Sequence, residues 1–110
     1  LPGGGSILAA VATAADADPV VCGKPHPPMA ALIADLLSSD AAPFDPDATL
    51  MVGDRPDTDG RFASALGCAF ALVRSGVTPP GTPVDEPVTI DAADLAELSR
   101  QLVTVGGRAQ

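Results

Sequence analysis

The residues of this sequence best suited to chemistry are one lysine and a later cluster of aspartates. Lys24 is the only lysine in a chain that has 14 acidic residues, and it stands in the run Val-Cys-Gly-Lys-Pro-His-Pro. An acidic loop follows further along the chain, from Asp54 to Asp59. An ammonium group stabilises charge on phosphoryl oxygens, and clustered carboxylates hold a divalent cation. Together the two motifs predict part of a phosphoryl-transfer site.

Asp54 is the predicted metal ligand. It follows the apolar run that ends at Val52, and ligands of open parallel sheets bind beyond the carboxyl ends of the strands. Gly53 allows a sharp turn, and Asp57 and Asp59 add negative charge that a cation would relieve. Mg²⁺ prefers such hard oxygen ligands, and no set of Cys and His suits a softer metal. The alternative is that Asp54 is a turn residue and that Asp57 or Thr58 caps the next helix.

Lys24 is the predicted phosphate-binding residue. Pro25 favours an extended backbone at Lys24, and a predicted helix begins just beyond it. An ammonium group and a helix N-terminus both favour a phosphate. The alternative is an exposed lysine in a loop, and the acidic loop downstream is what favours the functional interpretation.

Other reactive side chains have weaker claims to chemistry. His26 lies between two prolines and is predicted to be a partly exposed loop residue. Arg55 is expected either to touch a substrate or partner, or to pair with Asp57 or Asp59. Cys22 and Cys68 lie in apolar surroundings and fit no zinc motif, so we expect small buried core residues rather than a disulfide.

The elements that must position these residues alternate between helices and short apolar strands. Helices are predicted for residues 7–15, 27–38 and 58–66, with a last helix that Asp91 caps and that continues through Leu102; strands are predicted for residues 20–22, 49–52 and 70–73. Ser6 is the expected cap of the first helix, and Gly67 the expected stop of the third. Residues 75–87 are rich in Gly and Pro and are predicted to be irregular. The alternation indicates an α/β fold with a parallel sheet.

Two of these elements are expected to be well buried. The second helix has an apolar stripe, formed by Met29, Leu32, Ile33, Leu36 and Leu37. The continuous apolar run at residues 49–52 is typical of a strand that is covered on both faces of a parallel sheet.

Length and composition limit the function classes. The 110 residues, 46% of them hydrophobic, suffice for one small core but not for a second domain. The formal net charge of -8 argues against a nucleic-acid or anionic-membrane surface, because both require clustered Lys and Arg. No apolar run approaches the ~20 residues of a membrane span, and the first residues lack the order of a signal peptide. We therefore expect a cytoplasmic protein.

These motifs resemble the haloacid dehalogenase (HAD) superfamily, in particular its large-cap branch of phosphatases. Gly23-Lys24-Pro25 is similar to that family's lysine motif, and the run from Val52-Gly53-Asp54-Arg55 to Thr58-Asp59 is similar to its last acidic motif. The likeness continues into the Ser-Gly-Val-Thr loop at residues 75–78, and it covers about residues 2–103 in all. Within the branch, the sequence is most similar to bacterial members that act on glycerol 3-phosphate.

The resemblance implies a doubly wound, Rossmann-like sheet and Mg²⁺-dependent hydrolysis of a small phosphorylated metabolite through a phospho-aspartate. Lys24 would contact the phosphate and the nucleophilic carboxylate, Asp54 would ligate Mg²⁺, and Asp59 would support the metal waters or the lysine. The resemblance also implies that residues 1–18 end the cap domain and that residues 19–105 form the C-terminal half of the core. Residues 106–110 are expected to be a frayed tail.

The family's nucleophile is absent from its expected place. It is the first aspartate of an Asp-x-Asp motif near the N-terminus of the full protein. Asp16-Ala17-Asp18 matches these letters, but it follows a predicted helix and stands too close to Lys24. The missing N-terminal part of the same protein is therefore the expected partner. The strand near Leu50 would have an open edge, which favours association and allows a homodimer.

Two other hypotheses stay open. A phosphate-responsive receiver module also uses carboxylates, Mg²⁺ and a lysine, but there the phosphorylated aspartate precedes the lysine. A stable phosphorylated Asp54 would support that hypothesis. The other is an inactive fragment, which Mg²⁺-dependent turnover of a phosphate ester by these 110 residues alone would refute.

Overall fold

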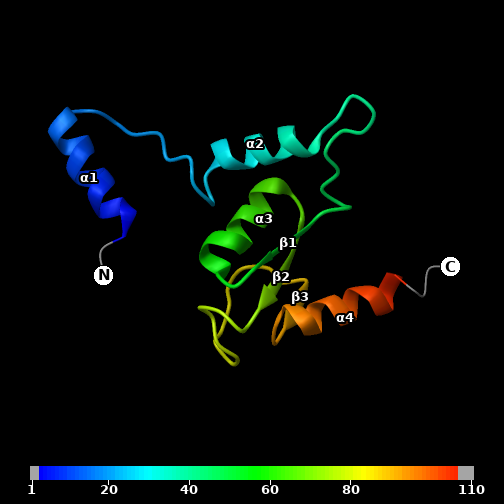
Figure 1. The fold of residues 1–110 in the computed structure, drawn as a ribbon. Helices are drawn as coiled ribbons and strands as arrows, with labels where there is room; N and C mark the ends of the chain where they lie inside the picture. Colours follow the sequence, from blue (N-terminus) through cyan, green and yellow to red (C-terminus); the bar gives the residue numbers. More distant parts are fainter. Residues whose placement is uncertain (1–2, 107–110) are drawn as a thin grey trace.

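The computed structural model describes residues 3–106 and has the predicted α/β architecture, a parallel sheet flanked by helices (Figure 1). The elements follow in the order α1 (Gly4–Ala15), α2 (Pro27–Leu37), β1 (Leu50–Gly53), the π-helical turn η1 (Pro56–Gly60), α3 (Arg61–Leu66), β2 (Ala69–Val73), β3 (Ile90–Ala92) and α4 (Leu95–Gly106).

The three strands are parallel and lie in the order β1-β2-β3. Leu50 is opposite Ala69, and Ala71 is opposite Ile90. Because the strands run in the same direction, the loops that follow β1 and β2 leave the sheet at the same edge. The candidate site lies at this edge.

Strand β2 is the centre of the core. Phe70, Ala71 and Leu72 are buried, and successive side chains of a strand point to opposite faces. On one face Phe70 and Leu72 pack with Ala63 of α3, and on the other face Ala71 packs with Leu98 of α4. Helices thus cover both faces of the sheet, which is the layering of a doubly wound, Rossmann-like fold.

Strand β1 is less buried than predicted. Within residues 3–106 only β2 pairs with it, and Val52 is 36% exposed. The expected cover on both faces is therefore wrong for Val52, whereas the open edge expected near Leu50 is present. An apolar run indicates what a strand can bury, but the neighbouring strand decides what it does bury.

Residues 20–22 do not form the predicted strand. Val20 is 77% exposed and Val21 39%, and no described strand lies beside them to share a hydrogen-bond ladder. Cys22 is exposed for the same reason, so its predicted burial is wrong. Cys68 is half-buried, and both thiols are free, as predicted.

Helix α2 has the predicted position, but its apolar stripe is not buried. Ala30 is its buried residue, whereas Leu32 is 49%, Leu36 68% and Leu37 57% exposed. The helix lies against α3, which has 6 residues. So short a partner cannot cover the longer apolar face of α2.

The predicted caps of two helices are wrong. Gly3, not Ser6, precedes α1, because its extended backbone lets its carbonyl accept the Ser6 N–H at 3.0 Å. Asp91 does not cap α4, because it belongs to β3 and pairs with β2.

Asp94 takes the place of Asp91 at the start of α4. Its Oδ1 accepts the Glu97 N–H at 2.7 Å, as an N-cap side chain does, and the Glu97 carboxylate accepts the N–H of Ala93, the residue before the cap, at 2.8 Å. The stop of α3 at Gly67 is confirmed by its left-handed φ of 74°.

The N-terminal end of the chain is extended away from the sheet. The Cα radius of gyration is 17.0 Å, whereas a compact domain of this length has about 13 Å. No residue of α1 is buried, and Figure 1 shows this helix apart from the sheet.

Of the helices in the described range, none has both the length and the apolar character needed to cross a membrane. The frayed tail predicted for residues 106–110 lies outside the described residues except for Gly106, at which α4 ends.

Candidate active site

Asp54 directly follows β1, at the carboxyl edge of the sheet. It is half-buried, and its Oδ2 accepts the backbone N–H of Val77 at 2.8 Å. Val77 lies in the loop that follows β2. A Cβ atom at Gly76 would overlap the Asp54 carboxylate, so the absence of a side chain there allows the loop to approach. The loops after β1 and β2 thus meet at this carboxylate.

Asp59 lies in η1 and is the one buried charged residue in the described part of the chain, with 6% exposure. Its Oδ2 accepts the backbone N–H of Arg55 at 3.2 Å. A Cβ atom at Gly53 would overlap this carboxylate as well, so Asp59 packs directly on the end of β1. The π-helical turn therefore folds the acidic loop back onto its own strand.

Lys24 comes from the segment that precedes α2, yet its side chain reaches the acidic loop. Its Nζ lies 2.7 Å from Oδ1 of Asp59, and the two side chains are 43% and 8% exposed. A buried carboxylate requires a partner of this kind, because an unpaired charge is costly to bury. The fold thus brings the ammonium of Lys24 to the loop that contains Asp54.

Arg55 and Asp57 form a separate ion pair on the surface. Nη2 of Arg55 lies 3.1 Å from Oδ2 of Asp57, and both side chains are more than half exposed. The hydrogen bond to Arg55 lowers the pKa of Asp57, and the same bond raises the pKa of Arg55. With its carboxylate engaged in this way, Asp57 does not cap the helical turn, so that prediction is wrong. His26 is an exposed residue just before α2, as expected.

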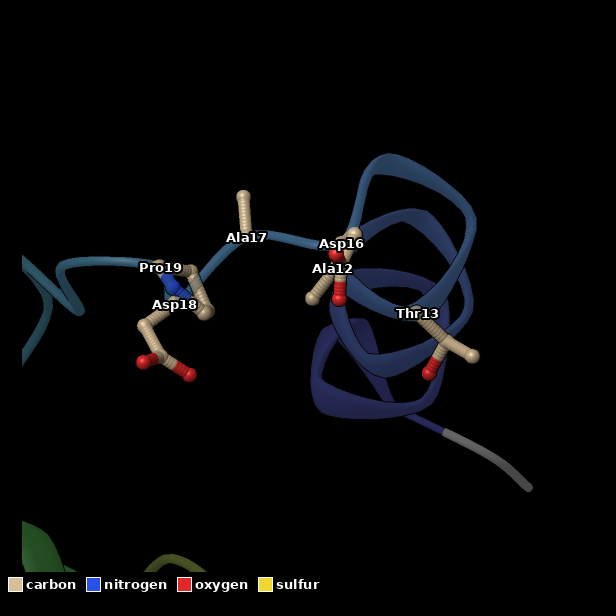
Figure 2. Close-up of a pocket in the computed structure, with 6 residues that line it drawn as sticks. All are labelled: Ala12, Thr13, Asp16, Ala17, Asp18 and Pro19. Atoms are coloured by element: carbon tan, nitrogen blue, oxygen red, sulfur yellow. The ribbon is translucent and has the colours of Figure 1, made fainter.

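The segment Asp16-Ala17-Asp18 follows helix α1 rather than a strand, and it is distant in sequence from the strands of the sheet. These residues line a shallow pocket together with Ala12, Thr13 and Pro19 (Figure 2). Asp16 ends the helix with a left-handed φ of 49°. Since one local segment forms this pocket and no residue of the candidate site lines it, the match to an Asp-x-Asp motif is one of letters only.

The sequence alone did not identify the residues that hold Asp54. Val77 contributes through its backbone, and Gly76 through the absence of a side chain. Residue type does not show that the Val77 N–H donates to Asp54, and a glycine at position 76 does not by itself show which side chain packs against it. The available signal was the Ser-Gly-Val-Thr loop, to which no site role was assigned.

Comparison with known proteins identifies the family. The profile of the HAD-hydrolase-like family matches residues 21–100, a range that contains Lys24, Asp54 and Asp59. The chain belongs to this family. Over 77 residues, or 70% of its length, this HAD chain is 44% identical to the D-glycerol 3-phosphate phosphatase of Mycobacterium tuberculosis. It is 43% identical to chronophin of Homo sapiens over the same length.

A solved structure supports the same relationship. A protein described as a p-nitrophenyl phosphatase from Bacillus subtilis matches 100% of the HAD chain with a TM-score of 0.69 and 26% identity. The chain spans 20% of the Mycobacterium protein, 24% of chronophin and 38% of the Bacillus chain. The similarity therefore concerns one part of each relative.

HAD phosphatases use a metal ion. The oxygen donors of this chain suit a hard cation but supply only part of its ligands. No cluster of three or more His, Cys, Asp or Glu side chains able to hold a metal occurs within the described residues. Asp54 uses Oδ2 for Val77, and no hydrogen bond of the described range involves its Oδ1. Asp59 engages both of its oxygens, with Lys24 and Arg55. Asp54 is thus the carboxylate with an oxygen left for a cation.

Proposed function

We propose that this chain supplies the lysine and the metal-binding carboxylate of a phosphatase that hydrolyses a small phosphate monoester with Mg²⁺. The observation that carries the proposal is the 2.7 Å contact between Lys24 and the buried Asp59, in the same loop as Asp54 at the carboxyl end of β1. The names of its relatives, a D-glycerol 3-phosphate phosphatase among them, support a small phosphorylated metabolite as substrate.

Lys24 would bind the phosphoryl group. An ammonium group has three N–H donors, and within the described range one of them is used, for Asp59. The remaining donors can contact a phosphoryl oxygen and the attacking carboxylate. Such contacts neutralise the charge that grows on the phosphoryl oxygens in the transition state. Asp59 would act through Lys24, by holding the ammonium at this edge of the sheet.

Asp54 would hold Mg²⁺. This ion binds one or two protein carboxylates and completes its coordination shell with waters and substrate phosphate. A single carboxylate ligand from this chain is therefore sufficient. When bound, the ion would supply further positive charge beside the phosphoryl oxygens.

The nucleophile would be an aspartate outside these 110 residues, as the family resemblance implies. One of its carboxylate oxygens would form a bond to phosphorus while the bond to the leaving alcohol breaks. Water would then release phosphate from the phospho-aspartate. We therefore expect no turnover by the 110-residue chain alone, and the rest of the same protein is its proposed partner.

The domain organisation and location belong to the same proposal. The exposed apolar side chains of α1, with Ile7 71% and Val11 59% exposed, suit a segment that completes a cap domain at residues 1–18. The open edge of β1 suits pairing with another strand of the same protein, and a homodimer is the alternative. Two free cysteines are consistent with a cytoplasmic location.

The test uses the complete protein with p-nitrophenyl phosphate as a generic ester. Lys24→Ala and Asp54→Asn should each lower kcat/KM at least ~10²-fold, the scale of losing one transition-state contact. Asp57→Asn is the matched control, because the Asp57 side chain is 61% exposed and forms an ion pair only with Arg55 among the described residues. Removal of Mg²⁺ with a chelator should abolish turnover, and added Mg²⁺ should restore it. Activity retained by Lys24→Ala, or unaffected by the chelator, would contradict the proposal.

A further inference from the structure

Arg74 connects the sheet with the loop that follows β2. Although it carries a charge, its side chain is only 12% exposed. Nε and Nη2 donate to the two carboxylate oxygens of Asp91 on β3, at 2.9 and 2.6 Å. A bidentate pair of this kind fixes the plane of the guanidinium group.

The remaining nitrogen of Arg74 reaches the loop itself. Nη1 donates to the backbone carbonyls of Pro79 at 3.3 Å and of Thr82 at 3.0 Å. Residues 75–87 contain no helix or strand, so no ladder of backbone hydrogen bonds fixes this loop. At Pro79 and Thr82, the planar guanidinium group of Arg74 therefore supplies hydrogen bonds that a ladder would otherwise provide.

The same loop carries the donor that holds Asp54. The Val77 N–H binds Oδ2 of Asp54 at 2.8 Å, and Gly76 has no room for a side chain beside that carboxylate. A small displacement of the loop would therefore remove the hydrogen bond and free the carboxylate to rotate.

We propose that Arg74 is a positioning residue for Asp54. Its bonds to Pro79 and Thr82 hold the loop, the loop holds Oδ2 of Asp54 through Val77, and Oδ1 is left for the cation. The consequence for catalysis rests on the proposed function, whereas the consequence for the Val77 amide does not.

Arg61 provides a matched control. It forms one ion pair, with Glu86 near the far end of the same loop at 2.8 Å, and its side chain is 63% exposed. Within the described residues it makes no hydrogen bond to Pro79, Thr82 or any residue between them. Arg61→Ala thus removes an arginine of α3 that contacts this loop, without releasing the part of the loop that holds Asp54.

The first measurement is amide hydrogen exchange at Val77, in the complete protein without substrate or metal. Arg74→Ala should accelerate this exchange about tenfold, as expected for losing a charge-assisted hydrogen bond. Arg61→Ala should change it by about twofold or less, because exposed ion pairs contribute little. Equal rates in the two variants would overturn the proposal.

Arg74→Lys covers the case in which Arg74→Ala does not fold. Lysine keeps the charge but cannot bind a carboxylate and two carbonyls from one planar group. Exchange at Val77 should again be faster than in Arg61→Ala, and a wild-type rate would count against the proposal.

The second measurement separates metal binding from substrate binding. In Arg74→Lys, the Mg²⁺ concentration for half-maximal hydrolysis should rise about fivefold or more, while KM for p-nitrophenyl phosphate should change less. A raised KM with an unchanged Mg²⁺ requirement would refute the role toward Asp54. If the wild-type protein hydrolyses no phosphate ester, the proposed function fails, and the Val77 exchange rates still decide the role of Arg74.

Discussion

The two halves of this chain differ in how well they are packed, and the candidate site joins them. In the sheet half, residues 50–104, β2 packs against helices on both faces, and Leu72 and Leu98 are fully buried. In the N-terminal half, residues 3–37, Ala30 is buried and α1 has no buried residue. Asp54 and Asp59 belong to the sheet half, and Lys24 belongs to the N-terminal half.

This difference shows what positions the ammonium group. The segment before α2 has little packing of its own, whereas Asp59 is buried and is held by the Arg55 N–H. Lys24 therefore takes its position from its ion pair with Asp59 more than from its neighbours in the sequence. The sheet half therefore determines where the ammonium group lies. The N-terminal half contacts the sheet half through the ion pair between Lys24 and Asp59 and through the packing of α2 on α3.

The sharpest test of the comparison removes one leucine from each half. Leu72→Ala should lower the free energy of unfolding by about 2–5 kcal/mol, because it leaves a cavity in the buried core. Leu36→Ala should change stability by less than about 0.5 kcal/mol, since this leucine is 68% exposed. Urea denaturation of the complete protein, followed by circular dichroism, measures both. A comparable loss for the two variants would show that α2 is covered in the complete protein.

The second test compares two glycines. Gly53→Ala should cost about 1–3 kcal/mol, because the added Cβ atom would overlap the Asp59 carboxylate at the end of β1. Gly23→Ala adds its Cβ atom where nothing lies within 4 Å, and it should be nearly neutral. The same urea titrations measure both variants. Neutral behaviour of Gly53→Ala would mean that Asp59 does not pack on the strand.

The third test breaks the link between the halves. Asp59→Asn keeps a hydrogen-bond acceptor but removes the charge that pairs with Lys24, so amides near residue 24 should exchange about tenfold faster. Asp57→Asn removes a carboxylate from the surface pair with Arg55 and should leave these amides unchanged. If both variants exchange at the wild-type rate, the ion pair does not position Lys24.

The smallest expected effect is a pH dependence confined to the sheet half. The hydrogen bond from Arg74 lowers the pKa of Asp91 in the folded state. The stabilisation of the folded state by this pair is therefore fully present above the ordinary aspartate pKa of about 4. The stabilisation is lost as the pH falls through the lowered pKa of Asp91. Because Asp91 is 48% exposed, we expect about 1 kcal/mol at most. Unfolding midpoints between pH 7 and pH 2 should converge for the wild type and Asp91→Asn, and a constant difference would contradict this assignment.

Local signals predicted most of the elements but not all of them. The apolar stripe correctly predicted the position of α2. Helix α3 ends at Gly67, as predicted from the ability of glycine to adopt a positive φ. Strand β3 was missed because three residues that include an aspartate have no apolar pattern. Residues 20–22 were predicted as a strand because they are apolar, although no described strand pairs with them. A strand is defined by its hydrogen-bond partner, which a local pattern does not contain.

By itself the sequence determined which side chains could do chemistry: one lysine in an acidic chain, and aspartates at the end of an apolar run. Only the tertiary structure decided how they are arranged. It pairs Lys24 with Asp59, holds Asp54 on the Val77 N–H, and connects that loop to Arg74. These contacts depend on which loops meet at one edge of the sheet, and therefore on strand order and direction. Residue type and spacing do not fix that order, because the contacts of Lys24 with Asp59 and of Asp54 with Val77 join residues 35 and 23 positions apart.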